Sequence, residues 1–412
     1  MTTTRRLQPH RLAAWALAGA AVAAACVPPA AADPVPLGPE TSLDSPLASD
    51  FSCPLLAGHD DGSFAVAWNR AIETDTEVVV RTADAGGVLD PAQVVARRRR
   101  FQIERLRLAP DPAGYTVLWK EGDSIVDGTR RAFFASERDA DGASLGGPLD
   151  LGRPTLDISP RPGGGFVAVW NGRRAINVQL LDAQGRETGP PVRIASSRIF
   201  FPGVVHSADG QFAVSWIQRI GLVDVLVARR FDAFGRSQGR NVQLVPRSEE
   251  FRFLSGYRLG LGDDGTLAVA YRLQPGNPSL DVSELLLLRT FDASGRPLQP
   301  PIILGEDAPG STFALVPDSV SVDPAGNTLV LWTEASGLND PFSSSSLAIV
   351  LPRGALAVES FEFASLASAD FHDVTCAIGT LAGDTWVIAW EAVGPSAGAF
   401  LGRRLFVRRF GR

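Results

Sequence analysis

The chain has 412 residues, is 45% hydrophobic and 20% charged, and carries a formal net charge of −6. These values are typical of a globular protein, and the acidic balance argues against a nucleic-acid partner, which requires a net basic face. Length alone would predict two or three domains, but the internal repeats described below replace that estimate with a single repeat domain.

The N-terminal 32 residues predict a secretory signal peptide. Arg5, Arg6 and Arg11 precede an apolar run from residue 12 to residue 25, and Ala30-Ala31-Ala32 forms an A-x-A-like cleavage site. Removal of these residues takes three arginines and no acid, which would change the net charge from −6 to −9. We therefore expect an exported protein, periplasmic or extracellular.

A second interpretation of the same segment is a lipoprotein signal. Ala23-Ala24-Ala25-Cys26 is a permissive match to a lipobox, whose cysteine would carry the lipid. Soluble export is the favoured alternative because of the downstream cleavage site. No other segment approaches the length of a transmembrane span.

Residues 33–412 contain seven copies of one pattern, best seen in Asp209-Gly210-Gln211-Phe212-Ala213-Val214-Ser215-Trp216. The closing aromatic recurs at intervals of 46 to 61 residues, which is in the range of propeller blades. It occupies positions Trp68, Trp119, Trp170, Trp216, Tyr271, Trp332 and Trp390.

The segments that end in these aromatics are expected to be the second strands of the repeats. Both faces of each segment are apolar, with Ser215 as the one hydroxyl at the position before the aromatic, so each strand should be covered on both sides. The expected strands are Ser63–Trp68, Tyr115–Trp119, Gly165–Trp170, Gln211–Trp216, Thr266–Tyr271, Thr328–Trp332 and Thr385–Trp390.

Turn sequences complete each repeat. Asp, Pro and Gly precede the second strand, and a second turn such as Asp232-Ala233-Phe234-Gly235 follows a third strand. A fourth strand then closes the unit. Four strands without helical periodicity predict an all-β, seven-bladed β-propeller of four-stranded antiparallel blades.

The last repeat ends after its third strand, Leu401–Phe410. The segment Pro36-Leu37-Gly38-Pro39-Glu40 is similar to fourth strands such as Gly189-Pro190-Pro191-Val192. We expect residues 36–43 to complete the seventh blade and close the ring, because an unfinished blade would leave an unpaired edge.

The combined pattern resembles bacterial secreted repeat proteins that spell Asp-Gly-x-Phe-Val-Val-x-Trp and then Arg-Phe-Asp-x-x-Gly. The likeness covers about residues 36–412. It implies the propeller architecture and carries over no catalytic residue.

Two sets of residues are candidates for a site. Arg97, Arg98, Arg99 and Arg100 lie in an expected blade-to-blade connection, with Arg105 and Arg107 beyond, and could bind an anion. Asp157, Asp318 and Asp373 lie on expected first strands and could line the channel as an acid–base pair of a glycosidase. The alternatives are a solvated basic loop and a polar, wet channel lining.

No metal site or cofactor is expected. Glu73, Asp75 and Glu77 alternate and could hold calcium, but the sequence lacks a glycine-centred ligand loop there. The histidines His10, His59, His206 and His372 show no metal-ligand spacing. Tyr115 and Tyr271 fill strand core positions, which leaves Tyr257 for another role.

Cys53 and Cys376 are expected to form a disulfide. Both lie on first strands, 15 and 14 residues before Trp68 and Trp390, in the repeats that a closed ring makes neighbours. Buried free thiols are the alternative. An oxidising compartment favours the bridge.

Two functions remain open. The first is a monomeric, non-enzymatic propeller that binds a glycan or another protein through the loops of variable length at one end of the ring. The second is a propeller glycoside hydrolase or lyase acting on extracellular glycans. Paired carboxylates with shifted pKa values at one mouth of the channel would favour the enzyme.

Overall fold

The computed structural model describes residues 34–43, 53–99, 103–122, 132–151, 157–172, 175–195, 199–220, 223–245, 251–275, 283–307, 314–335, 344–355, 360–364, 373–394 and 402–411. The chain divides into two compact units, Met1–Ala32 and Asp33–Arg412. The first unit lies outside the described residues, so the signal peptide and the lipobox at Cys26 stay predictions.

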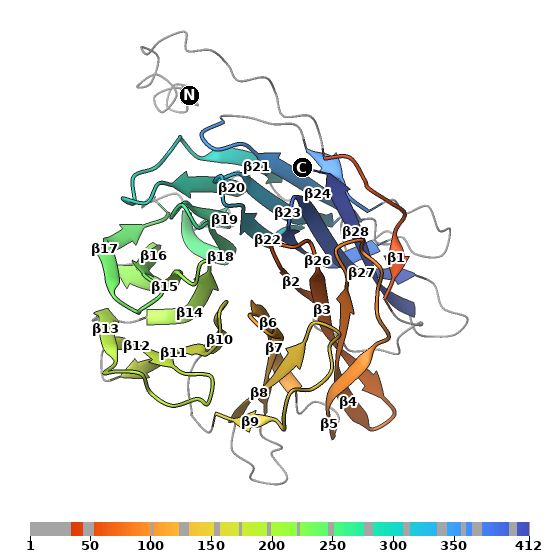
Figure 1. Cartoon of the computed structure of the whole chain (residues 1–412). Coiled ribbons are helices and arrows are strands. Elements are labelled where there is room, and N and C mark those ends of the chain that lie inside the picture. The colour runs from red at the N-terminus through yellow and green to blue at the C-terminus, as the bar shows by residue number, and fades with distance from the viewer. Residues whose placement is uncertain are drawn as a thin grey trace, which may run out of the picture. The chain divides into compact units, whose positions relative to one another are not determined.

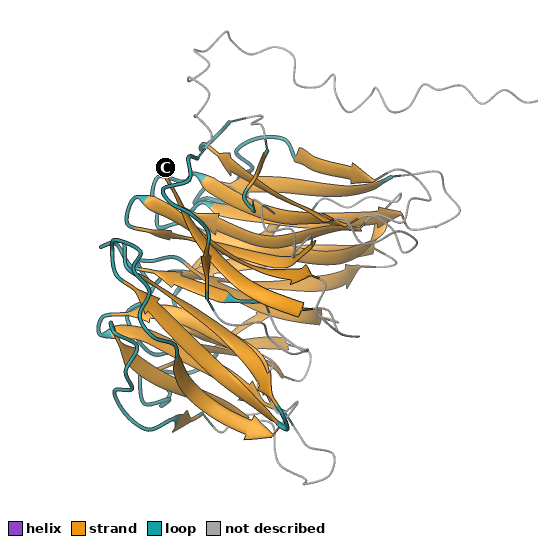
Figure 2. Ribbon diagram, turned by 90° about the vertical axis from the view of Figure 1, so that its right-hand side faces the viewer, coloured by secondary structure: helices purple, strands orange, loops and turns teal. Residues whose placement is uncertain are grey.

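The described part of the second unit forms seven antiparallel sheets of four strands each, arranged as the blades of a closed ring (Figure 1). The side view shows strands and loops and no helix in the described residues (Figure 2). This confirms the predicted seven-bladed propeller.

The first strand of each blade lies nearest the ring axis, where it contacts the first strands of the neighbouring blades. These strands are β2 (Leu55–Gly58), β6 (Ile103–Asp111), β10 (Asp157–Pro160), β14 (Ile199–His206), β18 (Phe251–Leu261), β22 (Ala314–Val322) and β26 (Asp373–Ala382).

The second strands follow the predicted segments and continue two to four residues past the closing aromatic. They are β3 (Phe64–Ile72), β7 (Gly114–Glu121), β11 (Phe166–Gly172), β15 (Phe212–Ile220), β19 (Leu267–Pro275), β23 (Thr328–Ala335) and β27 (Thr385–Gly394).

The third and fourth strands form the outer half of each blade. The third strands are β4 (Asp75–Ala83), β8 (Ala132–Asp139), β12 (Ala175–Leu181), β16 (Val223–Phe231), β20 (Glu284–Phe291), β24 (Ser344–Leu351) and β28 (Gly402–Gly411). The fourth strands are β5 (Gln93–Arg99), β9 (Leu149–Asp150), β13 (Val192–Ala195), β17 (Ser237–Gln243), β21 (Ile302–Asp307), β25 (Phe361–Glu362) and, for the seventh blade, β1 (Thr41–Ser42).

The hydrophobic core lies between the blades. Seven clusters of buried side chains each combine residues of two neighbouring blades, one cluster for each seam of the ring. Six of the seven closing aromatics are at most 1% exposed. Trp170 is partly buried and is the exception. The apolar character of both strand faces is therefore explained by burial on both sides.

The turns at one end of the ring follow one design. Asp232 shows it: its Oδ1 accepts hydrogen bonds from the backbone N–H of Phe234 at 2.9 Å and of Arg236 at 2.8 Å. Gly235 then adopts a φ of 78°, a conformation that favours glycine. We call this end, which carries the turns from first to second and from third to fourth strands, the uniform end. The opposite end, with the loops from second to third strands and the blade-to-blade connections, is the variable end.

The N-terminal segment completes the seventh blade, as predicted. Thr41 pairs with Val407 and Ser42 with Phe406 in an antiparallel register. The backbone N–H of Leu43 donates to the Leu405 carbonyl at 2.9 Å. The two ends of the described chain therefore share one sheet, and no blade is left with three strands among the described residues.

Candidate functional site

Irregular pairing recurs on the innermost strands. Five of the described first strands shift register against the second strand, within about two residues of the closing aromatic. The shifts lie between Ile103 and Arg105, Phe200 and Gly203, Leu254 and Tyr257, Pro317 and Ser319, and Val374 and Cys376. Such β-bulges turn a side chain away from its regular direction and are enriched beside functional sites. These bulges lie at or just beyond the level of the closing aromatics, toward the variable end of the ring axis.

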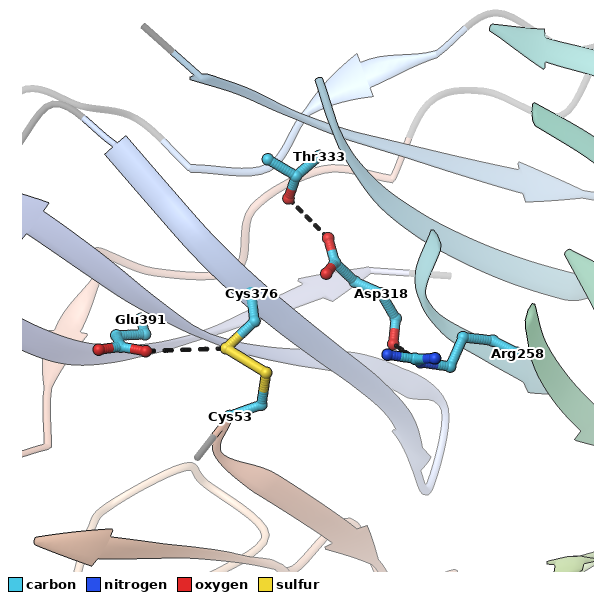
Figure 3. Close-up of a disulfide and its surroundings, with 6 residues drawn as sticks. All are labelled: Cys53, Arg258, Asp318, Thr333, Cys376 and Glu391. Atoms are coloured by element: carbon cyan, nitrogen blue, oxygen red, sulfur yellow. Dashed lines mark hydrogen bonds between the residues drawn. A yellow bond between two sulfur atoms is a disulfide. The ribbon is translucent and has the colours of Figure 1, made fainter. Parts of the chain in front are cut away.

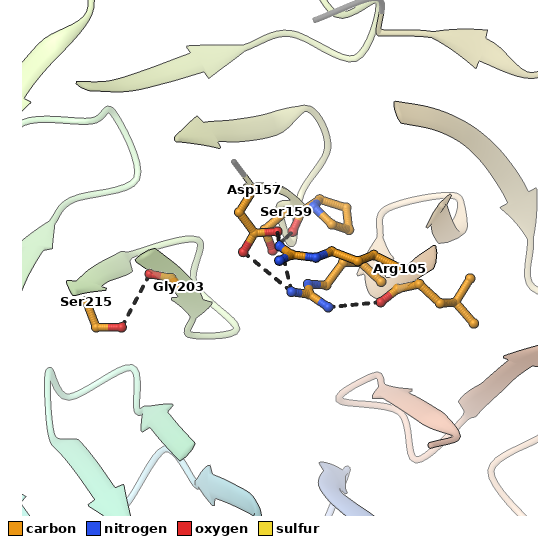
Figure 4. Close-up of polar contacts among 8 residues, drawn as sticks. Arg105, Asp157, Ser159, Gly203 and Ser215 are labelled. Atoms are coloured by element: carbon orange, nitrogen blue, oxygen red, sulfur yellow. Dashed lines mark hydrogen bonds and ion pairs between the residues drawn. The ribbon is translucent and has the colours of Figure 1, made fainter. Parts of the chain in front are cut away.

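The first group of polar side chains near these bulges combines residues of blades 2 and 3. Asp157, the first residue of β10, is 2% exposed. Its Oδ1 lies 3.5 Å from Nη1 of Arg105 and 3.4 Å from Nη2 of Arg107 (Figure 4). The two arginines are two residues apart on β6 and therefore share one face of that strand. Their side chains remain 45% and 36% exposed.

Both guanidinium groups face the single carboxylate of Asp157. Asp157 belongs to the predicted carboxylates, and the arginines that face it lie just beyond the predicted arginine run. Sequence reasoning did not connect the two sets, because they come together only through the packing of β6 against β10.

A second group joins blades 4 and 5. The hydroxyl groups of Ser215 and Tyr257 lie 3.2 Å apart, and Ser215 Oγ also lies 3.5 Å from the Gly203 carbonyl oxygen (Figure 4). The pKa of Tyr257 is raised, first because burial disfavours the phenolate; the hydrogen bond with Ser215 opposes the rise, and the charge of Asp157 adds to it. Ser215, the hydroxyl that stood out in an apolar strand pattern, is thus explained by its contact with Tyr257.

A third group joins blades 5 and 6. Asp318 is the extra residue of the bulge in β22, and its Oδ2 accepts a hydrogen bond of 2.6 Å from Thr333 Oγ1. The Asp318 carbonyl accepts a hydrogen bond of 2.8 Å from Arg258 Nε (Figure 3). Burial raises the pKa of the Asp318 carboxyl to about 7, although Thr333 and the Arg258 charge act in the opposite direction.

The two predicted channel carboxylates whose side chains the structure describes lie in different parts of the ring. Asp157 lies in blade 3 beside blade 2, whereas Asp318 lies in blade 6 and contacts blade 5. Asp373 is the first residue of β26, and its side chain lies outside the described residues. The described contacts therefore show one carboxylate with a raised pKa and no pair of interacting carboxylates at the axis.

The arginine run lies on a strand and not in a blade-to-blade connection. Arg97, Arg98 and Arg99 are the last residues of β5, so the expectation of a loop is wrong for them; Arg100 lies outside the described residues. Arg97 forms an ion pair with the fully buried Glu77. Arg98 pairs with Glu121 of the next blade at 2.6 Å. Arg99 is exposed and lies opposite Asp75. A ligand-binding role of the run stays a prediction.

The predicted disulfide between Cys53 and Cys376 is present (Figure 3). Their Cα atoms are 5.7 Å apart, within the range that a disulfide requires. Cys53 lies two residues before β2 of blade 1, so the expectation that it is on the strand is wrong, whereas Cys376 lies on β26 of blade 7, just after the bulge. The bond therefore ties the first and last blades together beside the axis.

Within the described ranges, no group of three or more His, Cys, Asp or Glu could hold a metal ion. Glu73, Asp75 and Glu77 lie in and beside the hairpin between β3 and β4, where Glu77 pairs with Arg70 and Arg97. The described chain also has no helix long and apolar enough to cross a membrane.

Comparison with known proteins defines the fold class. No protein-family model and no curated protein matches the chain. Among solved structures, it is similar to the polysaccharide lyase Uly1, with a TM-score of 0.53, 10% identity, and coverage of 86% of this chain and 90% of that one. It is also similar to an ulvan lyase of family PL25, with a TM-score of 0.50, 10% identity, and coverage of 90% and 95%. The Dos1 propeller follows with a TM-score of 0.43, 9% identity, and coverage of 91% and 95%.

At these identities the likeness concerns the fold alone. The protein is a seven-bladed β-propeller whose architecture resembles that of polysaccharide lyases. The propeller architecture that the resemblance to secreted repeat proteins implied is confirmed, whereas membership of that group stays a prediction.

Proposed function

We propose that this protein is an exported β-propeller that binds a ligand at the variable end of the ring axis without converting it. The observation that carries the proposal is the presence of three groups of polar side chains beside the bulges of the inner strands, between blades 2 and 3, 4 and 5, and 5 and 6. Buried polar groups that converge from several elements of a rigid scaffold are typical of binding sites. The disulfide between Cys53 and Cys376 supports export, because such bonds persist in oxidising compartments.

Binding without turnover is supported by how the carboxylates are engaged. Asp157 is neutralised by two arginines, and Asp318 is hydrogen-bonded to Thr333 in a different part of the ring. Glycoside hydrolysis needs two carboxyl groups on either side of one bond. The described contacts offer no such pair.

The second candidate is an enzyme acting on glycans, and one observation favours it. A carboxyl group with a pKa of about 7, such as Asp318, is half ionised at neutral pH and suits general acid–base chemistry. The fold similarity to two polysaccharide lyases is compatible with this candidate but concerns architecture only.

A glycan array, followed by titration calorimetry on the glycans that bind, tests the proposal. Arg258→Ala, next to the bulge in β18, should weaken binding by roughly tenfold or more, since it removes a charged donor. Arg236→Ala, an exposed arginine at the uniform end, is the matched control and should leave binding unchanged. Equal effects of the two variants would contradict binding at the variable end.

The same glycans separate binding from turnover. Prolonged incubation with wild-type protein should release neither new reducing ends nor unsaturated sugars. Product formation that is lost in Asp318→Asn would instead establish the enzyme.

A further inference from the structure

One position of the repeat holds a histidine in blade 4 and an uncharged residue in every other blade. This position is on the first strand, directly opposite the residue that lies four places before the closing aromatic. In blade 4 it is His206, which pairs with Phe212. In blades 1, 2, 3, 5, 6 and 7 it is Gly58, Pro110, Pro160, Leu261, Val322 and Leu381. A titratable side chain therefore lies where the repeat otherwise has none.

His206 faces the seam between blades 3 and 4. Residues directly opposite each other in an antiparallel pair share one face of the sheet, and Phe212 packs in the cluster between these two blades. The centroid of the imidazole lies 5.9 Å from that of the Phe212 ring. Phe212 in turn stacks on Phe231, with their centroids 4.8 Å apart. The imidazole is thus placed against an aromatic, apolar surface.

The imidazole has no polar partner in this position. Nδ1 and Nε2 of His206 are both buried, and among the described residues neither makes a hydrogen bond. A protonated imidazole has two N–H donors and a charge, whereas the neutral form has a single donor. Burial of unpaired donors and of a charge is costly, so the cost falls mainly on the protonated form.

Arg161 brings a positive charge close to the same site. It lies in the turn from the first to the second strand of blade 3, and its Nη2 donates across the seam to the Ala233 carbonyl of blade 4 at 2.5 Å. Burial, and then the Arg161 charge, lower the pKa of His206 to about 3, from an ordinary value of 6.5. The site therefore holds the neutral imidazole and disfavours the cation.

Other charged side chains on the surrounding turns and strands have partners of their own. They are Asp182, Asp209 and Asp232, which accept hydrogen bonds within their turns, Arg229, which donates to Asn241, Arg230, which donates to blade 5, and Arg236, which lies over the Phe234 ring. Among the described residues, the charge that acts on the pKa of His206 is that of Arg161.

We infer that protonation of His206 separates blades 3 and 4 at the uniform end of their seam, so that the ring opens there in acid. Near neutral pH and above, the neutral imidazole packs against the aromatic rings and the seam is closed. In acid, the imidazole accepts a proton only where water reaches it, because the closed seam offers it a second cation. Blade 4 lies across the ring from blades 7 and 1, which the disulfide joins (Figure 1), so that bond does not hold this seam. The inference does not depend on the proposed function.

The direction of the effect follows from the protons that each state binds. Between about pH 6.5 and pH 3, an open or unfolded chain binds a proton at His206 that the closed seam excludes. The closed state therefore loses stability as the pH falls through this window, and the equilibrium constant for opening rises by about tenfold for each pH unit.

Urea denaturation of wild-type protein and His206→Phe between pH 8 and pH 4.5 tests the titration. Phenylalanine keeps a ring in the site and does not titrate. The unfolding equilibrium constant of the wild type, relative to that of the variant, should rise by about tenfold for each pH unit below pH 6. His206→Asn also removes the titration and should give the same pH profile as His206→Phe, whatever its stability at pH 8.

Two variants of blade 3 separate titration from general weakening of the seam. Val169 is fully buried in the same cluster, so Val169→Ala is the matched control and should lower the urea midpoint equally at pH 8 and pH 5. Arg161→Gln removes the charge that faces His206. It should therefore reduce the loss of stability in acid, although it also weakens the hydrogen bond across the seam.

Hydrogen exchange at pH 7 and pH 5, corrected for the intrinsic effect of pH, locates the opening. Protection of β14 and β15 should fall at pH 5, whereas that of β26 and β27 should not, and His206→Phe should abolish the difference. Equal pH profiles of the wild type and both His206 variants would overturn the inference. Loss of protection that is uniform around the ring, or confined to another seam, would also overturn it.

Discussion

At the scale of single residues, arginine side chains form buried ion pairs and hydrogen bonds within and between blades. Glu77 is fully buried, and burial would raise its pKa, but hydrogen bonds from Arg70 and Arg97 lower it below its ordinary value. Arg230 donates to the carbonyl oxygens of Gly265, Asp292 and Ala293 in the next blade. These contacts pair groups whose burial without partners would be costly, so these three arginines serve the scaffold.

Asp318 gives a prediction at the same scale. Its folded-state pKa of about 7 lies above the ordinary value of 3.8, so between about pH 4 and pH 7 the native state holds a proton that the unfolded state releases. Its contribution to stability is present below pH 4 and is lost as the pH rises through 7. The unfolding free energy of Asp318→Asn minus that of the wild type should therefore be larger at pH 8 than at pH 4, by on the order of 4 kcal/mol at most.

Urea denaturation of wild-type and Asp318→Asn proteins at pH 4, 6 and 8 measures this effect. The relevant quantity is the difference in unfolding free energy between the two proteins, because other titrating groups cancel in it. A difference that does not change with pH would contradict a raised pKa.

At the scale of elements, the short strand β1 has an importance beyond its two residues. Leu43, next to it, is 2% exposed and packs in the cluster between blades 7 and 1. Arg81 Nη1 donates to the Leu43 carbonyl at 2.9 Å, and Arg408 Nε donates to the Gly38 carbonyl at 3.0 Å. The N-terminal segment thus contacts both blades that border the closing seam.

Shortening this segment should destabilise the whole ring. Deletion of residues 33–45 removes the fourth strand of blade 7 and exposes the edge of β28, so the unfolding temperature should fall markedly. Leu43→Ala should cost about 2 to 5 kcal/mol, the usual range for a buried leucine. Thr41→Ala, at an exposed position of the same segment, is the control and should change little. Calorimetric melting curves that coincide for the deletion and the wild type would contradict this role of β1.

At the scale of the whole molecule, the sequence predicts the architecture far better than the site. The repeated aromatic, the turn aspartates and the similarity of Pro36–Glu40 to other fourth strands were sufficient for the blade count and the closure, because each blade repeats the same local pattern. The disulfide followed from closure, which makes blades 1 and 7 neighbours.

The site depends on features that no local pattern records. The bulge that places Asp318 is a register shift between two strands, and the contact of Asp157 with Arg105 depends on the distance between two blades. The spacing of Arg105 and Arg107 on one face of a first strand was the available signal, but it lies beside a longer arginine run. That run in fact lies on an edge strand and pairs with neighbouring acids.

The seam between blades 7 and 1 is held both near the axis, by the disulfide, and at the outer edge of blade 7, by β1. Cross-linking residues 323 apart in sequence should stabilise the protein by about 6 kcal/mol as an upper figure, through the entropy of the unfolded chain. Cys53→Ser with Cys376→Ser should therefore lower the urea midpoint of the oxidised protein to that of the reduced wild type. Denatured, unreduced wild-type protein should show no reactive thiol beyond the one that Cys26 can supply; two further thiols would contradict the bond.

The stabilising effects of the disulfide and of the N-terminal segment should also depend on each other, because both resist the separation of blades 7 and 1. With the disulfide intact, Leu43→Ala leaves blades 1 and 7 joined at the axis, and only the outer contacts loosen. Without the disulfide, the same substitution should cost more, since nothing covalent then limits separation of the blades. A double-mutant cycle in urea measures the coupling, which we expect to be about 1 kcal/mol or more, as is usual for changes that share one structural element. Additive effects would mean that the ring opens at another seam first.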